Sequence, residues 1–320
     1  MRFSSRTVGL ASAIITVLIW SGFIVVARAS ASRGLLPLDI ALARILGASC
    51  VLLPWAWWLM RPARQRGEQV GSLLGLSPLP LVPTVQAGFL GGFLYAVLAY
   101  TGFFFAPASH ASVLMPGSLP LWTTLLAWWG LREHVSTARV LGLGCIVLGD
   151  LLVGGMSLLR AFEGGEVWKG DVLFMTAACC WAGYSVTVRR YGLDAVRATM
   201  AITAFACVFF VPLFALLTWL GVLPTHLPQT PWSEILFQAA FQGGGSVVIS
   251  GITFTFMVRH FGPVRSTMIT ALVPGLSAMG AVWFLGEPMH WNLLAGLALV
   301  TGGILLGVRQ ARPVAQGVKT

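Results

Sequence analysis

The chain has 320 residues, of which 57% are hydrophobic and 9% charged, and its mean hydropathy is +0.84. A soluble domain carries about 25% charged residues, so the composition excludes a soluble globular protein and indicates an integral membrane protein. The formal net charge is +10. A basic protein is expected to bind nucleic acid when its basic residues form a patch. Here they are spread over short loops, so the charge does not indicate nucleic-acid binding.

Ten apolar runs follow one another along the chain, each long enough for a helix of about 20 residues to cross a bilayer. They cover residues 8–27, 37–60, 82–101, 107–130, 137–157, 170–190, 196–220, 233–257, 264–285 and 291–308. Lipid offers no partner to an open backbone, so these runs must be helices, and they are too long and too uniformly apolar for barrel strands. The sequence predicts an all-α integral membrane protein with ten transmembrane helices.

The connections between the runs are short. A linker rich in Arg, Gly and Pro covers residues 61–83, a turn is expected at Arg259–Pro263, and a basic, disordered tail is expected after Gly307. The first run follows two arginines, as a signal peptide would. It is longer than the 7–15 apolar residues of a signal peptide, so we interpret it as the first span.

Basic residues are sorted by loop. With the N-terminus inside, fifteen of the twenty Lys and Arg residues fall in cytoplasmic loops and tails, and Arg44 lies within a span. The four in outer loops are Arg28, Arg33, Arg160 and Lys169. This bias follows the positive-inside rule, so we expect both termini in the cytoplasm and no nucleic-acid partner.

Two sequence blocks occur twice. The pattern W-x-G-aromatic-x-V-x-x-R begins at Trp20 and again at Trp181, a shift of 161. A second block recurs at a shift of 154 and pairs Ser112 with Ser266, Pro120 with Pro274, Trp129 with Trp283, Glu133 with Glu287, Gly142 with Gly296, and Gly149 with Gly303. Five spans per half is an odd number, so the second half must enter the membrane from the opposite side. We therefore predict two inverted five-helix repeats, residues 1–160 and 161–320, as in many secondary transporters.

The repeated W-x-G-aromatic motif, the prolines of the fourth and ninth spans, and the Glu followed by a Gly-rich helix that closes each half resemble the drug/metabolite transporter superfamily. The similarity is to its ten-helix EamA-type bacterial exporters, over about residues 8–308. The resemblance implies alternating access and a central cavity built from spans one to four and six to nine. It also implies a multi-pass protein of the bacterial inner membrane whose partners are a small-molecule solute and membrane lipid, and it leaves a homodimer open.

The eighth span carries a polar stripe. Gln238, Gln242, Ser246 and Ser250 are spaced four residues apart, which places them along one side of a helix. The stripe lines a cavity, or it packs between helices, where amides and small residues also bind neighbours. We place Gln238, Gln242 and Ser246 in a substrate site.

Interior prolines mark the fourth and ninth spans. Pro120 and Pro274 each remove a backbone hydrogen bond, so we expect both helices to kink there. Thr270 lies on the same face as Pro274 and joins the candidate site. Aromatic walls suit an amphipathic solute, although aromatic residues also mark membrane interfaces. From the aromatic residues we assign Trp20, Phe23, Tyr95, Trp122, Trp181 and Tyr184 to the site and interpret Tyr100 as interfacial.

Two charges lie deep within spans. Arg44 and Asp150 are each about seven residues from an outer helix end, about 10 Å below the surface, and we expect them to pair. The charges act in one gate or bind a solute carboxylate; the alternatives are a structural ion pair or snorkelling at the outer rim. Asp150 and His110 are candidates for coupling to protons, with an interfacial histidine as the alternative for His110. Glu133 and Glu287 recur by symmetry at helix starts, which indicates a role in the fold.

These observations favour a secondary transporter, and the resemblance favours export of amino acids, related amphipathic solutes or drugs. An intramembrane enzyme acting on lipid-linked substrates and a channel are the alternatives. The chain has no HExxH motif and its histidines are scattered, so we expect no catalytic residues. Its five cysteines lie within apolar spans without a CxxC motif, so we expect no metal site and no cofactor.

Overall fold

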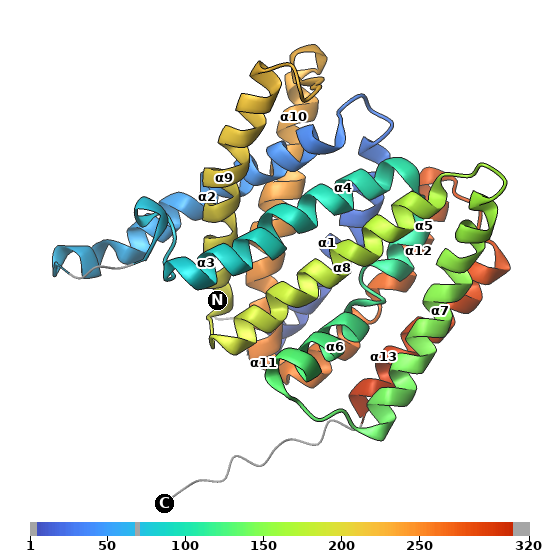
Figure 1. Cartoon of the computed structure of the whole chain (residues 1–320). Helices are drawn as coiled ribbons and strands as arrows, with labels where there is room; N and C mark the ends of the chain where they lie inside the picture. Colours follow the sequence, from blue (N-terminus) through green and yellow to red (C-terminus); the bar gives the residue numbers. More distant parts are fainter. Residues whose placement is uncertain (1–4, 68–70, 310–320) are drawn as a thin grey trace, which may run out of the picture.

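The computed structural model describes residues 5–67 and 71–309, which are almost entirely helical (Figure 1). The helices of the first half are α1 (Ser5–Ser30), α2 (Pro37–Gln65), η1 (Leu73–Gly75), α3 (Leu81–Ala87), η2 (Gly88–Leu94), α4 (Tyr95–Phe105), α5 (Ala108–Leu114), α6 (Leu119–Leu131) and α7 (Thr137–Ala161). Those of the second half are α8 (Val167–Arg190), α9 (Ala195–Trp219), η3 (Leu227–Gln229), α10 (Trp232–Gln238), η4 (Ala239–Ile249), α11 (Ser250–Thr270), α12 (Val273–Leu285) and α13 (Trp291–Arg309).

Eight helices in the described part of the chain are long and apolar enough to cross a membrane. They are Thr7–Ser30, Pro37–Gln65, Leu81–Phe105, Thr137–Ala161, Val167–Arg190, Ala195–Trp219, Trp232–Val258 and Met268–Leu285. The all-helical membrane fold is therefore confirmed, whereas the count of ten stays a prediction. The other two expected spans correspond to the broken pair α5–α6 and to the shorter apolar helix Trp291–Gly307.

Of the expected turn at Arg259–Pro263 and the expected tail after Gly307, the structure describes only the first in full. The turn expected at Arg259–Pro263 is helical instead, because α11 includes both the end of the eighth span and the start of the ninth. The tail expected after Gly307 lies mostly outside the described residues, which end at residue 309.

The expected kinks at Pro120 and Pro274 are wrong, because each proline begins a new helix. Residues 115–118 form a turn that includes Pro116, and Pro120 occupies the first turn of α6. Pro274 has the same place in α12, after the turn formed by residues 271 and 272. Proline has no N–H group to bond, so the first turn of a helix accepts it without loss. The fourth span is thus broken near its middle.

Helices α7 and α13 lie side by side at one edge of the bundle (Figure 1). A Cβ added at Gly142 would lie 2.5 Å from the Gly303 carbonyl oxygen, and one added at Gly149 would lie 2.7 Å from that of Gly296. The repeated glycines therefore let the two backbones touch, as small residues do between membrane helices. The pairing is antiparallel and reciprocal. Gly142 meets Gly303, which is the repeat counterpart of Gly149, and Gly149 meets Gly296, which is the counterpart of Gly142.

The remaining helices also pack in reciprocal pairs across the two halves. Helix α8 packs on α4 and α6 of the first half, and its counterpart α1 packs on α11 and α12 of the second half. In the same way, η2 packs on α9, and its counterpart η4 packs on α2. This is the pattern expected of two halves related by a two-fold axis.

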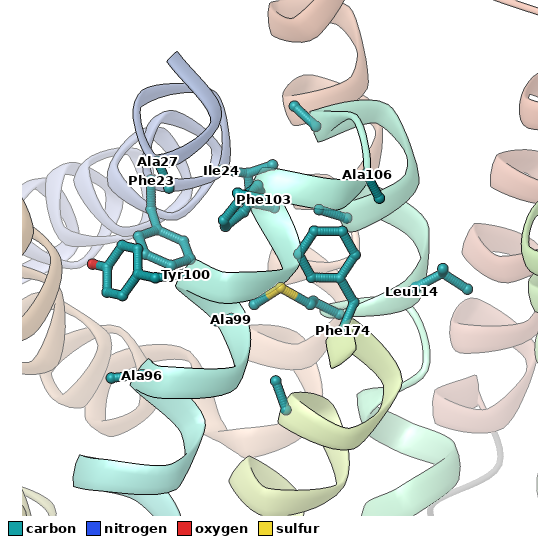
Figure 2. Packing of buried hydrophobic residues seen from close by; sticks show 14 of the residues in the cluster. Phe23, Ile24, Ala27, Ala96, Ala99, Tyr100, Phe103, Ala106, Leu114 and Phe174 are labelled. Atoms are coloured by element: carbon teal, nitrogen blue, oxygen red, sulfur yellow. The ribbon is translucent and has the colours of Figure 1, made fainter. Parts of the chain in front are cut away.

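Aromatic side chains fill the core between α1, α4 and α8 (Figure 2). The Phe103 and Phe174 ring centroids are 4.9 Å apart, and Phe23 meets Tyr100 edge to face at 6.1 Å. The interfacial interpretation of Tyr100 is wrong, because its side chain is 1% exposed and its hydroxyl finds a buried acceptor.

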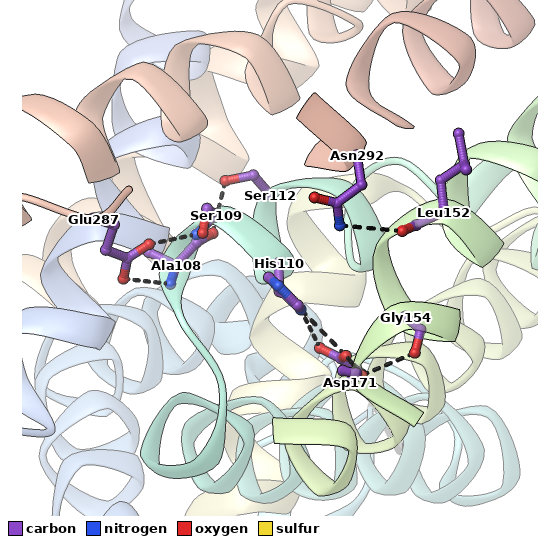
Figure 3. Close-up of polar contacts among 10 residues, drawn as sticks. Ala108, Ser109, His110, Ser112, Leu152, Gly154, Asp171, Glu287 and Asn292 are labelled. Atoms are coloured by element: carbon purple, nitrogen blue, oxygen red, sulfur yellow. Dashed lines mark hydrogen bonds and ion pairs between the residues drawn. The ribbon is translucent and has the colours of Figure 1, made fainter. Parts of the chain in front are cut away.

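The two repeated glutamates bind across the halves. Glu287 accepts hydrogen bonds from the backbone N–H groups of Ala108 and Ser109, at 2.8 and 2.9 Å (Figure 3). It also lies 3.6 Å from the Arg28 guanidinium. Glu133 forms an ion pair with Arg189. Arg28 and Arg189 are the repeated arginines of the W-x-G-aromatic motif, so each half supplies the acid for the arginine of the other.

Candidate functional site

A cavity of about 100 Å³ lies at the centre of the bundle. It is lined by Trp20, Phe23, Ile24, Arg44, Tyr95, Met115, Pro116, Leu119, Ala178, Trp181, Ser246 and Val273. The break in the fourth span supplies Met115 and Pro116 to this wall. A volume of this size holds about three waters, whereas sites for drug-sized ligands measure about 300–1,000 Å³.

Glycines bring η4 against α2 beside this cavity. A Cβ at Gly243 would lie 2.6 Å from the Arg44 carbonyl oxygen, and one at Gly47 would lie 2.1 Å from that of Ala239. Segment η4 is wound as a π-helix, a form that recurs at functional sites. The π-helix η2 repeats the arrangement in the first half, where Gly92 meets the Ile202 carbonyl oxygen.

This close packing holds the Arg44 guanidinium at the cavity wall. Its Nη1 donates to Ser246 Oγ at 3.0 Å and to the Gln242 carbonyl oxygen at 3.3 Å, and its Cζ lies 5.5 Å from the Phe23 ring centroid. Arg44 is 9% exposed, and in the described residues its side chain forms no ion pair with an acid. A buried guanidinium bound by neutral acceptors retains capacity for an anion.

Aromatic side chains form most of the remaining wall. Tyr95 and Trp181 have centroids 4.8 Å apart, and Tyr184 follows Trp181 at 5.0 Å from behind the wall. Trp20 stacks on Phe254 at 5.2 Å. The repeated tryptophans of the two halves thus line the same cavity.

Five of the residues predicted for the substrate site lie outside the cavity wall, and one of them, Trp122, lines a different cavity. Gln242 is fully buried, and its Oε1 accepts a hydrogen bond from the Tyr100 hydroxyl at 3.1 Å. Gln238 donates to Ser30 Oγ and Glu234 Oε1, which ties α10 to the end of α1. Tyr184 packs behind Trp181, and Thr270 ends α11 three residues before Val273. The π-winding of η4 explains why the four-residue spacing of the glutamines and serines does not form one stripe.

The expected pair between Arg44 and Asp150 is wrong. Asp150 and Trp122 line a second cavity of about 440 Å³ between α6, α7 and α8, which does not include Arg44. Helix α7 extends to Ala161, so Asp150 lies about 16 Å from its end, deeper than Arg44 lies in α2. Both carboxylate oxygens are buried and have no hydrogen-bond partner among the described residues.

His110 is partly buried and bound to an acid that the sequence interpretation overlooked. Its Nδ1 lies 2.9 Å from Asp171 Oδ1, and the Ser157 hydroxyl donates to the other oxygen of this carboxylate (Figure 3). Asp171 is the second residue of the predicted span 170–190, and an acid inside a span was the signal that could have identified it.

The EamA-like transporter family matches residues 7–155 and 168–309, one copy in each half. The chain belongs to the EamA-like transporter family. The resemblance to the drug/metabolite transporter superfamily is confirmed, and the chain is a multi-pass membrane transporter.

Similar proteins agree with this assignment. An uncharacterized transporter of Archaeoglobus fulgidus is 26% identical over 300 residues, covering 92% of this chain and 96% of its own. The WAT1-related protein At4g08290 of Arabidopsis thaliana is 24% identical and covers 90% of this chain and 79% of its own. A solved crystal structure covers 96% of this chain and 98% of its own at a TM-score of 0.56 and 21% identity, which shows a shared fold.

Proposed function

We propose that the chain is a secondary transporter that binds a small zwitterionic or amphipathic carboxylate in the central cavity and moves it by alternating access. The observation that carries this is Arg44, a buried guanidinium at the wall of an aromatic cavity, held by Ser246 and the Gln242 carbonyl oxygen. The guanidinium fork matches a carboxylate, and Trp20, Phe23 and Trp181 provide apolar surface for the rest of the solute.

The reciprocal packing supports a layout of ten helices in two inverted repeats, residues 1–160 and 161–320. In that layout the cavity lies near the membrane midplane, between the halves. Because the cavity is smaller than an amino acid requires, the halves must rock apart to admit solute from either side. The basic residues of the loops support an inner-membrane protein with cytoplasmic termini, and the family resemblance supports export.

Among the described residues that line the central cavity, Arg44 alone is charged, which favours one class of solute. A nucleotide or sugar phosphate carries more than one negative charge and is usually bound by several basic groups. A carboxylate with an apolar or aromatic body is matched by one guanidinium and several rings.

A thermal-shift screen of the purified protein in detergent tests this assignment. A ligand that binds only the folded state raises the apparent stability in proportion to ln(1 + [L]/Kd). We expect aromatic and large apolar amino acids to raise the melting temperature, and sugars and nucleobases to leave it unchanged. A shift with sugars alone would contradict the role given to Arg44.

A further inference from the structure

We propose that the cavity between α6, α7 and α8 is a second binding site, distinct from the central cavity, for an amphipathic organic cation with one amine. The ammonium group binds the Asp150 carboxylate, and the apolar body lies against Trp122 and Trp168. This lateral site contains none of the residues that line the central cavity.

Asp150 provides the first argument. Its side chain is 7% exposed, it lines the cavity, and neither carboxylate oxygen has a hydrogen-bond partner within residues 5–67 and 71–309. An ionised carboxylate in an apolar environment is costly unless it is paired. A cation that enters the lateral site supplies the missing partner.

The other polar groups of the lateral site determine the charge of the ligand. Asp171 also lines it, but His110 and Ser157 already bind that carboxylate. The described residues that line the site include no Lys, Arg or His. The described lining therefore offers no basic group to hold a lipid phosphate, and Asp150 is its one carboxyl group without a partner.

Two tryptophans suit the body of such a ligand. Trp122 and Trp168 both line the lateral site, and their large rings offer apolar surface to the body of the ligand. The Trp122 indole N–H is buried and lacks an acceptor in the described part of the chain. The volume of about 440 Å³ falls within the range of sites that hold drug-sized ligands.

The position of the lateral site indicates how the ligand arrives. The cavity extends from Trp168, in the first turn of α8, to Asp150, about 16 Å along α7 from its end. Leu151, Leu158 and Val172 line it and are 60, 53 and 53% exposed, so they face lipid. An amphipathic amine partitions into this layer of the membrane and enters from the side.

The test measures binding of 4-phenylbutylamine to the purified full-length protein by isothermal titration calorimetry. The neutral analogue 4-phenylbutan-1-ol controls for apolar binding. Asp150→Asn keeps the shape of the side chain and removes its charge. Asp194→Asn is the matched control, because Asp194 is an exposed N-cap of α9 and asparagine caps equally well.

We expect the Kd of the amine to rise at least tenfold in Asp150→Asn and to stay unchanged in Asp194→Asn, with no change for the alcohol. An amine Kd that is the same in Asp150→Asn, or no saturable binding by the wild type, would overturn the proposal. Loss of amine binding in Arg44→Ala, with Asp150→Asn unaffected, would assign the amine to the central cavity and overturn it too.

A second measurement uses the wild type alone and so does not depend on whether Asp150→Asn folds. Dicyclohexylcarbodiimide, a membrane-soluble reagent, modifies carboxyl groups in apolar environments, and mass spectrometry of the α7 peptide reports its reaction with Asp150. The amine should slow this labelling and the alcohol should not. Equal labelling with and without the amine would overturn the site.

Discussion

Replacing Gly243 by alanine should separate η4 from α2 and weaken solute binding at Arg44. The added Cβ would lie 2.5 Å from the Ala48 nitrogen and 2.6 Å from the Arg44 carbonyl oxygen. Both are backbone atoms, so neither can turn aside. Ordinary contacts between carbon and its neighbours begin at about 3.5 Å, so the two helices must move apart by about 1 Å.

That displacement is large compared with the contact it disturbs. The bond from Arg44 Nη1 to Ser246 Oγ is 3.0 Å long, and a lengthening of about 1 Å takes it beyond hydrogen-bond range. Overpacking costs about 1–3 kcal/mol, and loss of a hydrogen bond to a charged group costs about 1.5–3 kcal/mol. We expect a lower melting temperature and at least a tenfold weaker solute Kd.

Gly244 is the matched control, because a Cβ there would meet no atom within 4 Å. Gly244→Ala should leave solute binding unchanged and should not lower the melting temperature, since alanine favours a helix over glycine by about 1 kcal/mol. Thermal melts and titration calorimetry on both variants measure the difference. Equal effects of the two substitutions would refute the close-packing argument.

Three further variants test the cavity wall and the fold. Trp181→Ala removes the ring that packs on Tyr95 and should reduce solute affinity about tenfold, as measured by titration calorimetry, while membrane insertion stays intact. Wild-type affinity in this variant would show that Trp181 is not part of the site. Gln242→Ala leaves the buried Tyr100 hydroxyl without its acceptor, which lowers the free energy of unfolding by about 1–3 kcal/mol. Both the melting temperature and the transport rate should therefore fall, and wild-type values for both would contradict this. Glu287→Ala should lower the melting temperature more than Glu133→Ala does. Glu287 caps α5 and its side chain is 11% exposed, whereas the Glu133 side chain is 37% exposed, and exposed ion pairs contribute only about 0–1 kcal/mol. A larger effect of Glu133→Ala would contradict this ranking.

The membrane fold and the repeat were predictable because each depends on local or periodic information. Long apolar runs specify spanning helices, and the recurrence of glycines at a fixed shift marked α7 and α13 as equivalent helices of the two halves. Trp20, Arg44 and Trp181 could be selected as cavity candidates because a charge or a repeated aromatic inside a span is unusual.

Other features depend on contacts that no local pattern encodes. The bond between Arg44 and Ser246 joins residues 202 positions apart, and the π-winding of η4 moved the glutamines out of the expected stripe. For Arg44 and Asp150 the sequence indicates only the depth of each residue in its helix. Depth does not specify which side of a helix faces which cavity, and the two residues line different ones.

Solute flux into proteoliposomes tests the role of Arg44 most directly. The comparison uses Arg44→Ala and Arg61→Ala, because Arg61 lies on the same helix but is exposed and stacks on Trp57. Arg64 is a poorer control, since it donates to the Gly75 carbonyl oxygen and holds the linker. With a radiolabelled aromatic amino acid, Arg44→Ala should abolish uptake and Arg61→Ala should transport as the wild type does. Wild-type uptake by Arg44→Ala would contradict the proposal that this guanidinium binds the solute.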